Sequence, residues 1–188
     1  MKKQSYSGTI SAGIAAPNSL TTMVQAAMIA AIYVVLTLIA NAFGLANGLT
    51  IYAVQVRFSE ALTILPYFTP AAIPGLFVGC LLSNILTGCA LPDIIFGSIA
   101  TLLGALGTYA LRKWKWLAPV CPIIANAIIV PLVLIYGYGL LIEGWPVLQC
   151  LGYYFLTVGA GEVISCGILG MILLFSLQKY SAKIFVRD

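Results

Sequence analysis

Charged residues are scarce in this sequence. Its 188 residues include nine Lys or Arg and five Asp or Glu, so that 7% are charged and 62% are hydrophobic. About a quarter of the residues of a typical soluble domain are charged. The composition therefore excludes a soluble domain and indicates an integral membrane protein.

Histidine is absent, which removes the usual general base and the most common zinc ligand. No lysine follows a glycine, so the chain lacks the G-x-x-x-x-G-K-[ST] loop that binds nucleotide phosphates. The few acidic residues are scattered, whereas a metal-dependent phosphotransferase needs them clustered. These absences argue against an enzyme, and we expect no catalytic residue, no cofactor and no metal ion.

Long apolar runs fill most of the chain. A helix needs about 20 residues to cross the hydrocarbon core, and continuous apolar runs do not fit the alternating strands of a membrane barrel. We predict an all-α integral membrane protein with one six-helix domain over residues 20–178, between tails at 1–19 and 179–188. The predicted transmembrane helices are Leu20–Ile39, Leu49–Phe68, Ala71–Thr87, Asp93–Leu111, Leu117–Tyr138 and Val147–Gln178.

The basic residues predict the orientation. Apart from Arg57 they fall before the first span, between the fourth and fifth, and after the sixth. With six spans these three places lie on one side, and the positive-inside rule makes that side cytoplasmic. We therefore predict a multi-pass protein of the cell membrane with both termini in the cytoplasm. The positive net charge then reflects topology and gives no reason to expect a nucleic-acid partner.

Three charged residues, Arg57, Glu60 and Glu162, lie inside otherwise apolar stretches. An ionisable group at that depth costs at least about 2.5 kcal/mol, so such residues face the protein interior and are often functional. Arg57 and Glu60 are three residues apart on a predicted helix and can meet on one face. An internal ion pair and a ligand-binding role remain equally open for them.

Glu162 is the strongest single candidate for ligand recognition. Its depth along the last predicted span places it in the outer third of the bilayer, among the small residues Gly159, Ala160 and Gly161. A lone carboxylate there has to be protonated or matched by a cationic or donor-rich ligand.

Weaker candidates are polar residues near the predicted outer face or within other spans. The amides of Asn84 and Asn126 offer donors and acceptors, although hydrogen bonding between helices is their more common use. Asp93 is most simply a helix N-cap, with ligand binding as the alternative. Glu143 beside Trp145 suits a cover over a flat ligand, and Tyr52 lies near the top of the second span.

The first predicted span carries two overlapping pairs of alanines four residues apart, Ala26 with Ala30 and Ala27 with Ala31. Small residues at this spacing let another helix approach closely. Packing within the chain and docking of a partner are both compatible with these pairs.

Four runs of the sequence are distinctive: QVRFSEALTILPYF at Gln55–Phe68, PAAIPGLFVGC at Pro70–Cys80, LPDIIFGSIATL at Leu91–Leu102 and GAGE at Gly159–Glu162. These runs closely resemble the QueT family. Members of this family are substrate-binding S-components of energy-coupling factor (ECF) transporters, associated with uptake of queuosine precursors, which are 7-deazaguanine bases. The resemblance implies six helices, a ligand site near the outer face, and docking onto a membrane T-component energised by two ATPase subunits. It also implies that an Ala-x-x-x-Ala surface on the first helix meets the T-component.

An autonomous channel or facilitator for another nucleobase or vitamin is the main alternative. It requires an open polar path through the cytoplasmic half, where polar residues are sparse beyond Glu60. A membrane enzyme is the third possibility, and the missing histidine and acidic clusters weigh against it.

Overall fold

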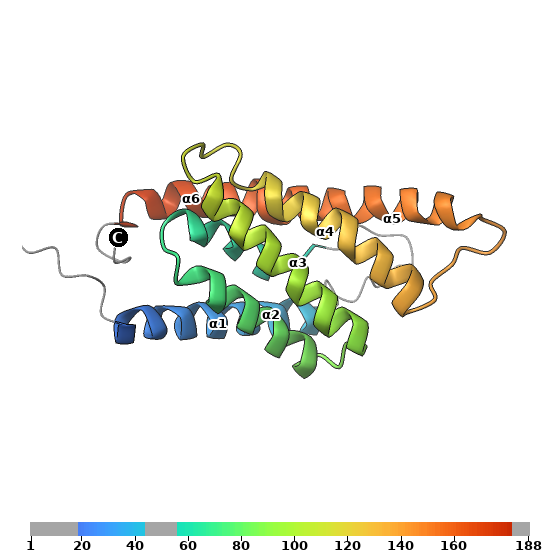
Figure 1. The fold of residues 1–188 in the computed structure, drawn as a ribbon, viewed down its shortest axis with the longest axis horizontal. Coiled ribbons are helices and arrows are strands. Elements are labelled where there is room, and N and C mark those ends of the chain that lie inside the picture. The colour runs from blue at the N-terminus through green and yellow to red at the C-terminus, as the bar shows by residue number, and fades with distance from the viewer. Residues whose placement is uncertain (1–18, 44–55, 182–188) are drawn as a thin grey trace, which may run out of the picture.

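The computed structural model describes residues 19–43 and 56–181, and within these ranges all regular structure is helical. The helices form an elongated bundle in which α3 and α4 run obliquely to α5 and α6, as Figure 1 shows. In chain order they are α1 (Ser19–Ala42), the 3-10 helix η1 (Phe58–Tyr67), α2 (Ala72–Leu86), α3 (Leu91–Ala110), α4 (Val120–Leu132), the π-helix η2 (Val133–Gly137), α5 (Val147–Glu162), the π-helix η3 (Val163–Leu169) and α6 (Gly170–Gln178).

Four helical segments of the described chain are long and apolar enough to cross a membrane. They are α1, α3, α4 continued by η2, and the 32-residue run formed by α5, η3 and α6. The helix α2 has only 15 residues. The predicted count of six spans is therefore not confirmed, although an all-helical multi-pass protein is.

The second predicted span differs most from the structure. Its described part is not an α-helix but the ten-residue 3-10 helix η1, which contains Pro66. Eight consecutive residues of η1, Ser59 to Pro66, are buried, and η1 packs against α1, α3, η3 and α6. A proline removes a backbone donor and disfavours a regular α-helix. The remainder of this predicted span lies outside the described residues.

Helices α1 and α2 pack closely because glycines of α2 face alanines of α1. A Cβ atom added to Gly75 would lie 2.6 Å from the carbonyl oxygen of Ala26, and one on Gly79 would lie 3.1 Å from the Cα of Ala30. The glycines are four residues apart, as are the alanines, so the two helices touch along matched rows. The Ala26/Ala30 pair is thus used for packing within the chain.

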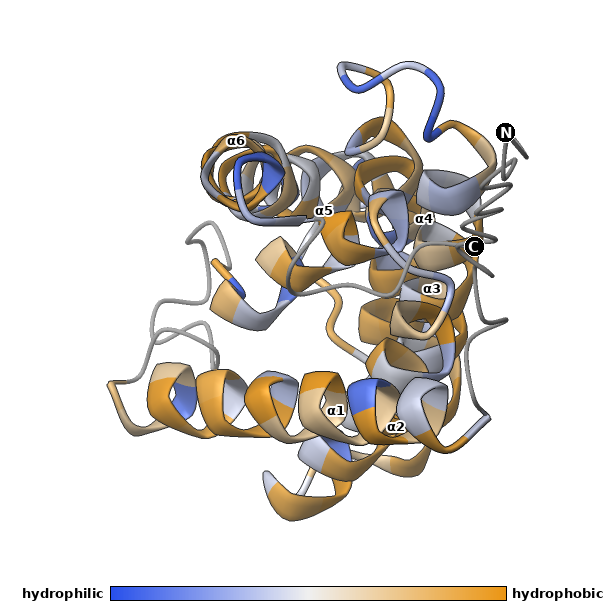
Figure 2. Cartoon of the chain, turned by 90° about the vertical axis from the view of Figure 1, so that its left-hand side faces the viewer, coloured by the Kyte–Doolittle hydropathy of each residue, from blue (hydrophilic) through white to orange (hydrophobic). Residues whose placement is uncertain are grey.

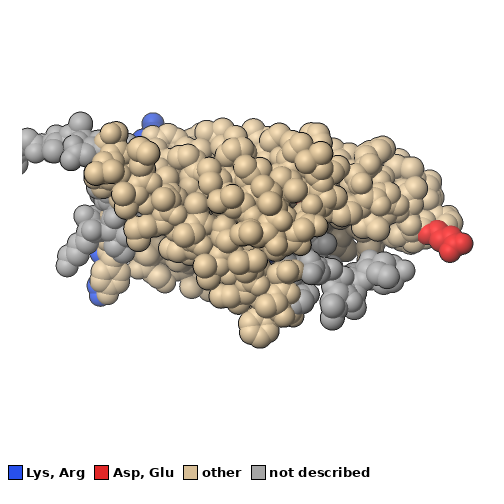
Figure 3. Space-filling view, turned by 90° about the horizontal axis from the view of Figure 1, so that it is seen from below, with Lys and Arg blue, Asp and Glu red and all other residues tan. Residues whose placement is uncertain are grey.

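The surface matches a lipid environment. Many large apolar side chains are exposed, among them Met28 and Val35 on α1 and Ile128 on α4. Figure 2 shows that most of the helical ribbon carries the colours of hydrophobic residues. On the face drawn in Figure 3, the charged side chains of the described residues lie at the two ends of the molecule. An uncharged belt between charged ends is the expected profile of a protein that crosses the membrane.

Candidate functional site

A cavity of about 230 Å³ opens near one end of the bundle. Its wall is formed by the C-terminal parts of α1 and α2, the N-terminal parts of η1 and α3, and the C-terminal part of α4 with η2. These element ends lie away from the end at which α1 begins and α6 finishes (Figure 1). The polar and charged lining residues are Tyr33, Thr37, Asn41, Arg57, Ser59, Ser83, Asn84, Thr87, Asp93 and Tyr138.

Asp93 lies in the first turn of α3 and lines this cavity. The predicted role as N-cap is wrong: the N-cap residue is Ala90, and no side chain caps the helix. The Asp93 carboxylate instead accepts a hydrogen bond from the Tyr138 hydroxyl at 3.4 Å, while the Tyr138 oxygen accepts one from the backbone N–H of Ala90 at 3.0 Å. The negative charge is further stabilised by its position at the helix N-terminus.

Asn84 reaches the same place from α2. Its Nδ2 donates to the Asp93 carbonyl oxygen at 3.4 Å, and its side chain is buried. Gly97 makes room for both side chains, because a Cβ there would lie 3.2 Å from Asp93 Oδ1 and 3.3 Å from Asn84 Nδ2. Asn84 therefore positions the start of α3 and also contributes to the cavity wall.

Arg57 supplies the positive charge of the cavity wall. Its backbone N–H donates to Ser165 Oγ at 3.1 Å, which ties the start of η1 to η3. No ion pair between Arg57 and Glu60 is seen among the described residues, and both Glu60 carboxylate oxygens accept hydrogen bonds from neutral donors. The cavity wall thus holds one guanidinium, that of Arg57, and one carboxylate, that of Asp93, and no ion pair between these two is seen among the described residues.

Glu60 is the centre of a buried hydrogen-bond cluster next to the cavity lining. Its Oε1 accepts from the hydroxyls of Tyr33 and of Thr101, the latter at 3.1 Å, and its Oε2 accepts from Asn126 Nδ2 at 3.3 Å. These donors come from α1, α3 and α4, so one carboxylate joins three helices to η1. The buried carboxylate of Glu60 thus accepts three hydrogen bonds from neutral donors, as buried polar groups in proteins usually do. Neither Glu60 nor Asn126 lines the cavity; both belong to this buried cluster, called the floor below, which adjoins the cavity lining through Tyr33.

Glu162 belongs to this buried cluster and does not line the cavity. It ends α5, is 3% exposed, and accepts from Cys166 Sγ at 3.1 Å. A carboxylate oxygen of Glu60, a carboxylate oxygen of Glu162 and the Sγ of Cys166 all lie within 4.8 Å of one another. Carboxylates and thiolates bind metal ions. A metal ion here would compete with the hydrogen bonds that Glu60 already accepts, so we assign no metal site.

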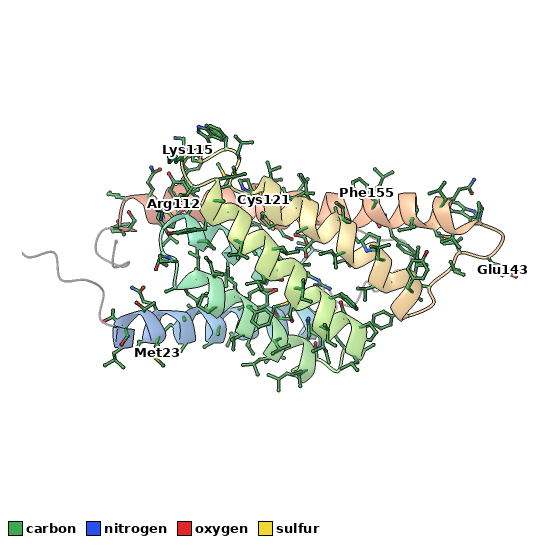
Figure 4. The ribbon with its side chains drawn as sticks, in the orientation of Figure 1. Met23, Arg112, Lys115, Cys121, Glu143 and Phe155 are labelled. Carbon is green, nitrogen blue, oxygen red and sulfur yellow. The ribbon has the colours of Figure 1, made fainter. Side chains whose placement is uncertain are left out.

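The loop before α5 contributes Leu140 to the cavity lining, but its later residues Glu143 and Trp145 do not line the cavity. Glu143 is exposed at the far end of the molecule, as Figure 4 shows, and Trp145 packs edge to face on Tyr153 with 5.9 Å between ring centroids. Neither residue lines the cavity, so the structure does not bring this predicted cover to it. Tyr52 lies outside the described residues.

Seven polar residues of the cavity wall were not predicted from the sequence: Tyr33, Thr37, Asn41, Ser59, Ser83, Thr87 and Tyr138. Tyr33 and Asn41 come from α1, and Tyr138 follows η2. Tyr33 could have been predicted from the sequence, because it places a hydroxyl group in the middle of an apolar span. For Asn41 and Tyr138 the signal was weak, because polar and aromatic residues are common at span ends.

The predicted docking alanines separate into two classes. Ala26 and Ala30 face α2, whereas Ala27 and Ala31 are exposed on the opposite side of α1. Only the Ala27/Ala31 pair therefore remains accessible to another protein.

The described part of the chain is helical, with apolar outer faces and a polar cavity between its helix ends, an arrangement suited to binding a small ligand within a membrane. The family model described as QueT transporter matches residues 23–179, and the chain belongs to this family. Comparison with curated proteins and with solved structures gives no match.

Proposed function

We propose that this protein is the substrate-binding S-component of an ECF-type importer and captures a 7-deazaguanine base from outside the cell. Membership of the QueT transporter family supports transport of a small molecule across the membrane. The observation that carries the finer proposal is a small cavity walled by both a guanidinium and a carboxylate, Arg57 and Asp93.

The orientation follows from the basic residues. Arg112, Lys113 and Lys115 lie between α3 and α4, and Lys179 follows α6, at the end of the bundle away from the cavity. From the positive-inside rule we infer that this end is cytoplasmic and that the cavity faces outward. A substrate-capturing subunit needs its site on that side.

The size and polarity of the cavity suit one bicyclic base. Sites for drug-sized ligands usually span about 300–1,000 Å³, so a cavity of about 230 Å³ favours a smaller molecule. A guanine-like edge offers an N1–H and a 2-amino group side by side, and the Asp93 carboxylate can accept from both. Arg57 can donate to the O6 atom of the same base.

We therefore propose that the carboxylate that binds the base is Asp93, and not Glu162 as the sequence suggested. Glu162, Glu60 and Asn126 then hold the adjoining floor in shape. The two assignments make different predictions, because Glu162→Gln alters the buried cluster while Asp93→Asn alters the cavity wall.

Isothermal titration with 7-deazaguanine tests the proposal. Each charge-assisted hydrogen bond contributes about 1.5–3 kcal/mol, so Asp93→Asn is expected to weaken binding by about 100-fold. Glu162→Gln should change the affinity much less in protein that remains folded. If Glu162→Gln weakens binding strongly and Asp93→Asn does not, Glu162 and not Asp93 contacts the base. If the unsubstituted protein does not bind 7-deazaguanine, the proposed substrate class is wrong.

The partners belong to the same proposal. The chain contains no phosphate-binding loop, so ATP-driven uptake needs a partner that binds ATP. The resemblance to ECF S-components implies that the partners are two ATPase subunits and a membrane T-component. The exposed Ala27/Ala31 face of α1 is the proposed docking surface, since small residues allow a partner helix to approach closely. A facilitator that works alone remains the competing function.

A further inference from the structure

Asn41, one residue before the end of α1, lines the cavity and has an unsatisfied oxygen. Its carboxamide Oδ1 is buried, with less than 1 Å² exposed, and makes no hydrogen bond. Among the side chains that the structure describes, this is the one buried nitrogen or oxygen atom without a partner.

An unsatisfied buried acceptor is unusual and unfavourable. Most buried side-chain polar atoms in proteins have at least one hydrogen-bond partner, and each exception needs a reason. Leaving such an acceptor unpaired destabilises the free protein. An acceptor beside a cavity becomes satisfied when a bound molecule donates to it.

The other polar groups of the cavity wall on α1 and α2 are already engaged within the chain. The hydroxyl of Thr37 donates to the Tyr33 carbonyl oxygen at 2.9 Å, and that of Thr87 donates to the Ser83 carbonyl oxygen at 2.8 Å. Asn41 differs from these residues because its oxygen has no internal donor.

We infer that Asn41 is a ligand-binding and specificity-determining residue whose Oδ1 accepts a hydrogen bond from an N–H group of the substrate. Asn41 comes from α1 and Asp93 from α3, and α2 packs against both helices. Because the two acceptors come from different helices, the proposal assigns them to different edges of a small ligand. This inference rests on the proposed function in taking the cavity as the substrate site, and it adds that the ligand must carry N–H donors on two edges.

For a 7-deazaguanine the second donor edge is the one that carries N9–H. A base whose N9 bears a sugar or a methyl group has lost this donor. The site should accordingly prefer the free base to its N9-substituted derivatives, and Asn41 should be responsible for part of that preference.

The test compares Asn41→Leu with the parent protein, because leucine has nearly the shape of asparagine without its polar atoms. Replacing an unpaired acceptor by an apolar group is expected to leave the unfolding temperature of the ligand-free protein unchanged or to raise it. The same substitution should weaken binding of 7-deazaguanine by about 5- to 10-fold, the equivalent of one neutral hydrogen bond. For 9-methyl-7-deazaguanine the two proteins should bind with equal affinity.

Thr108→Val provides the matched control. Thr108 is completely buried and far along α3 from the cavity lining, and its hydroxyl donates to the Ala118 carbonyl oxygen at 3.0 Å. This variant should lose stability and keep its affinity, the reverse of the pattern expected for Asn41→Leu.

Two results would overturn the inference. A lower unfolding temperature of ligand-free Asn41→Leu would mean that Oδ1 is already bonded, and an unchanged affinity for 7-deazaguanine would mean that no ligand donor reaches it. If the parent protein binds neither base, the substrate class proposed above fails, while the unfolding temperature of Asn41→Leu still decides whether the oxygen is held unpaired.

Discussion

Tyr33 on α1 donates a hydrogen bond from its hydroxyl to the Glu60 carboxylate on η1. Tyr33 also lines the cavity, whereas Glu60 is completely buried in the adjoining floor. The wall and the floor of the site are thus joined by one bond between residues 27 positions apart. The stability of this floor should therefore be sensitive to the number of acceptors at position 60.

Replacing Glu60 by Gln should destabilise the protein. Glutamine keeps one acceptor oxygen but presents an NH₂ group where a donor from Tyr33, Thr101 or Asn126 now points. An unsatisfied buried group costs about 1–3 kcal/mol, so the unfolding temperature of the purified protein should fall by several degrees. The exposed Glu143→Gln should not change it. Equal unfolding temperatures for both variants would show that the cluster does not hold the helices together.

Gly79→Ala should weaken the contact of α1 with α2. The added Cβ would lie 2.8 Å from the Cβ of Tyr33, so the helices have to separate, at a cost of about 1–3 kcal/mol. Gly152→Ala is the control, since nothing lies within 4 Å of a Cβ there and alanine favours a helix more than glycine does. Thermal unfolding should rank the proteins with Gly79→Ala lowest. The opposite ranking would mean that the α1–α2 contact is not tight.

Ala31→Leu should impair docking of a partner without harming the fold. Ala31 is exposed, so a larger side chain fits but holds a partner helix away. Less T-component should copurify with this variant, and its affinity for the base should be unchanged. Ala30→Leu is the contrasting substitution, because Ala30 is buried against α2 and a leucine there should lower the unfolding temperature. Normal copurification of Ala31→Leu would exclude this face as the docking surface.

Cys89 offers a chemical probe of the cavity. It lies between α2 and α3, lines the cavity and is half-buried, and burial raises the pKa of its thiol. The thiolate is the reactive form, so alkylation by a soluble maleimide should be slow at pH 7 and should accelerate as the pH rises above the ordinary cysteine value of about 8.5. A bound base should slow the reaction further. Mass spectrometry of the labelled protein, with Cys89→Ser as control, measures both effects; labelling that a saturating base does not slow would place the base elsewhere.

Liposomes that contain only this protein should not accumulate 7-deazaguanine, even with ATP inside. The chain has no phosphate-binding loop with which to use ATP. Uptake of the radiolabelled base should begin when the T-component and both ATPase subunits are added. Equilibration of the base across the membrane by the protein alone would favour the facilitator.

The sequence predicts the long apolar helices well because length and hydropathy alone define them. The runs near residues 91–110, 120–137 and 147–178 all form spans of sufficient length. The 3-10 form of η1 was not predictable, because it depends on how Ser59 to Pro66 are buried among other helices and not on their hydropathy.

The candidate site was predicted in its residue types and only partly in its geometry. Arg57, Asn84 and Asp93 do line the cavity, whereas Glu162 was placed by depth along one helix and joins Glu60 in the floor instead. Asn126 and Glu60 meet although they are 66 positions apart. Which helices face each other cannot be read from spacing along a single chain.

The 3-10 geometry of η1 has a consequence for how the protein is made. Ten residues at about 2 Å per residue extend about 20 Å, roughly two-thirds of the hydrocarbon thickness. Backbone that is not α-helical persists at such depth only where protein surrounds it. During synthesis, η1 therefore cannot leave the translocon as an independent segment facing lipid. We expect it to enter the bilayer late, shielded by the α3 and α6 segments that follow it in the chain.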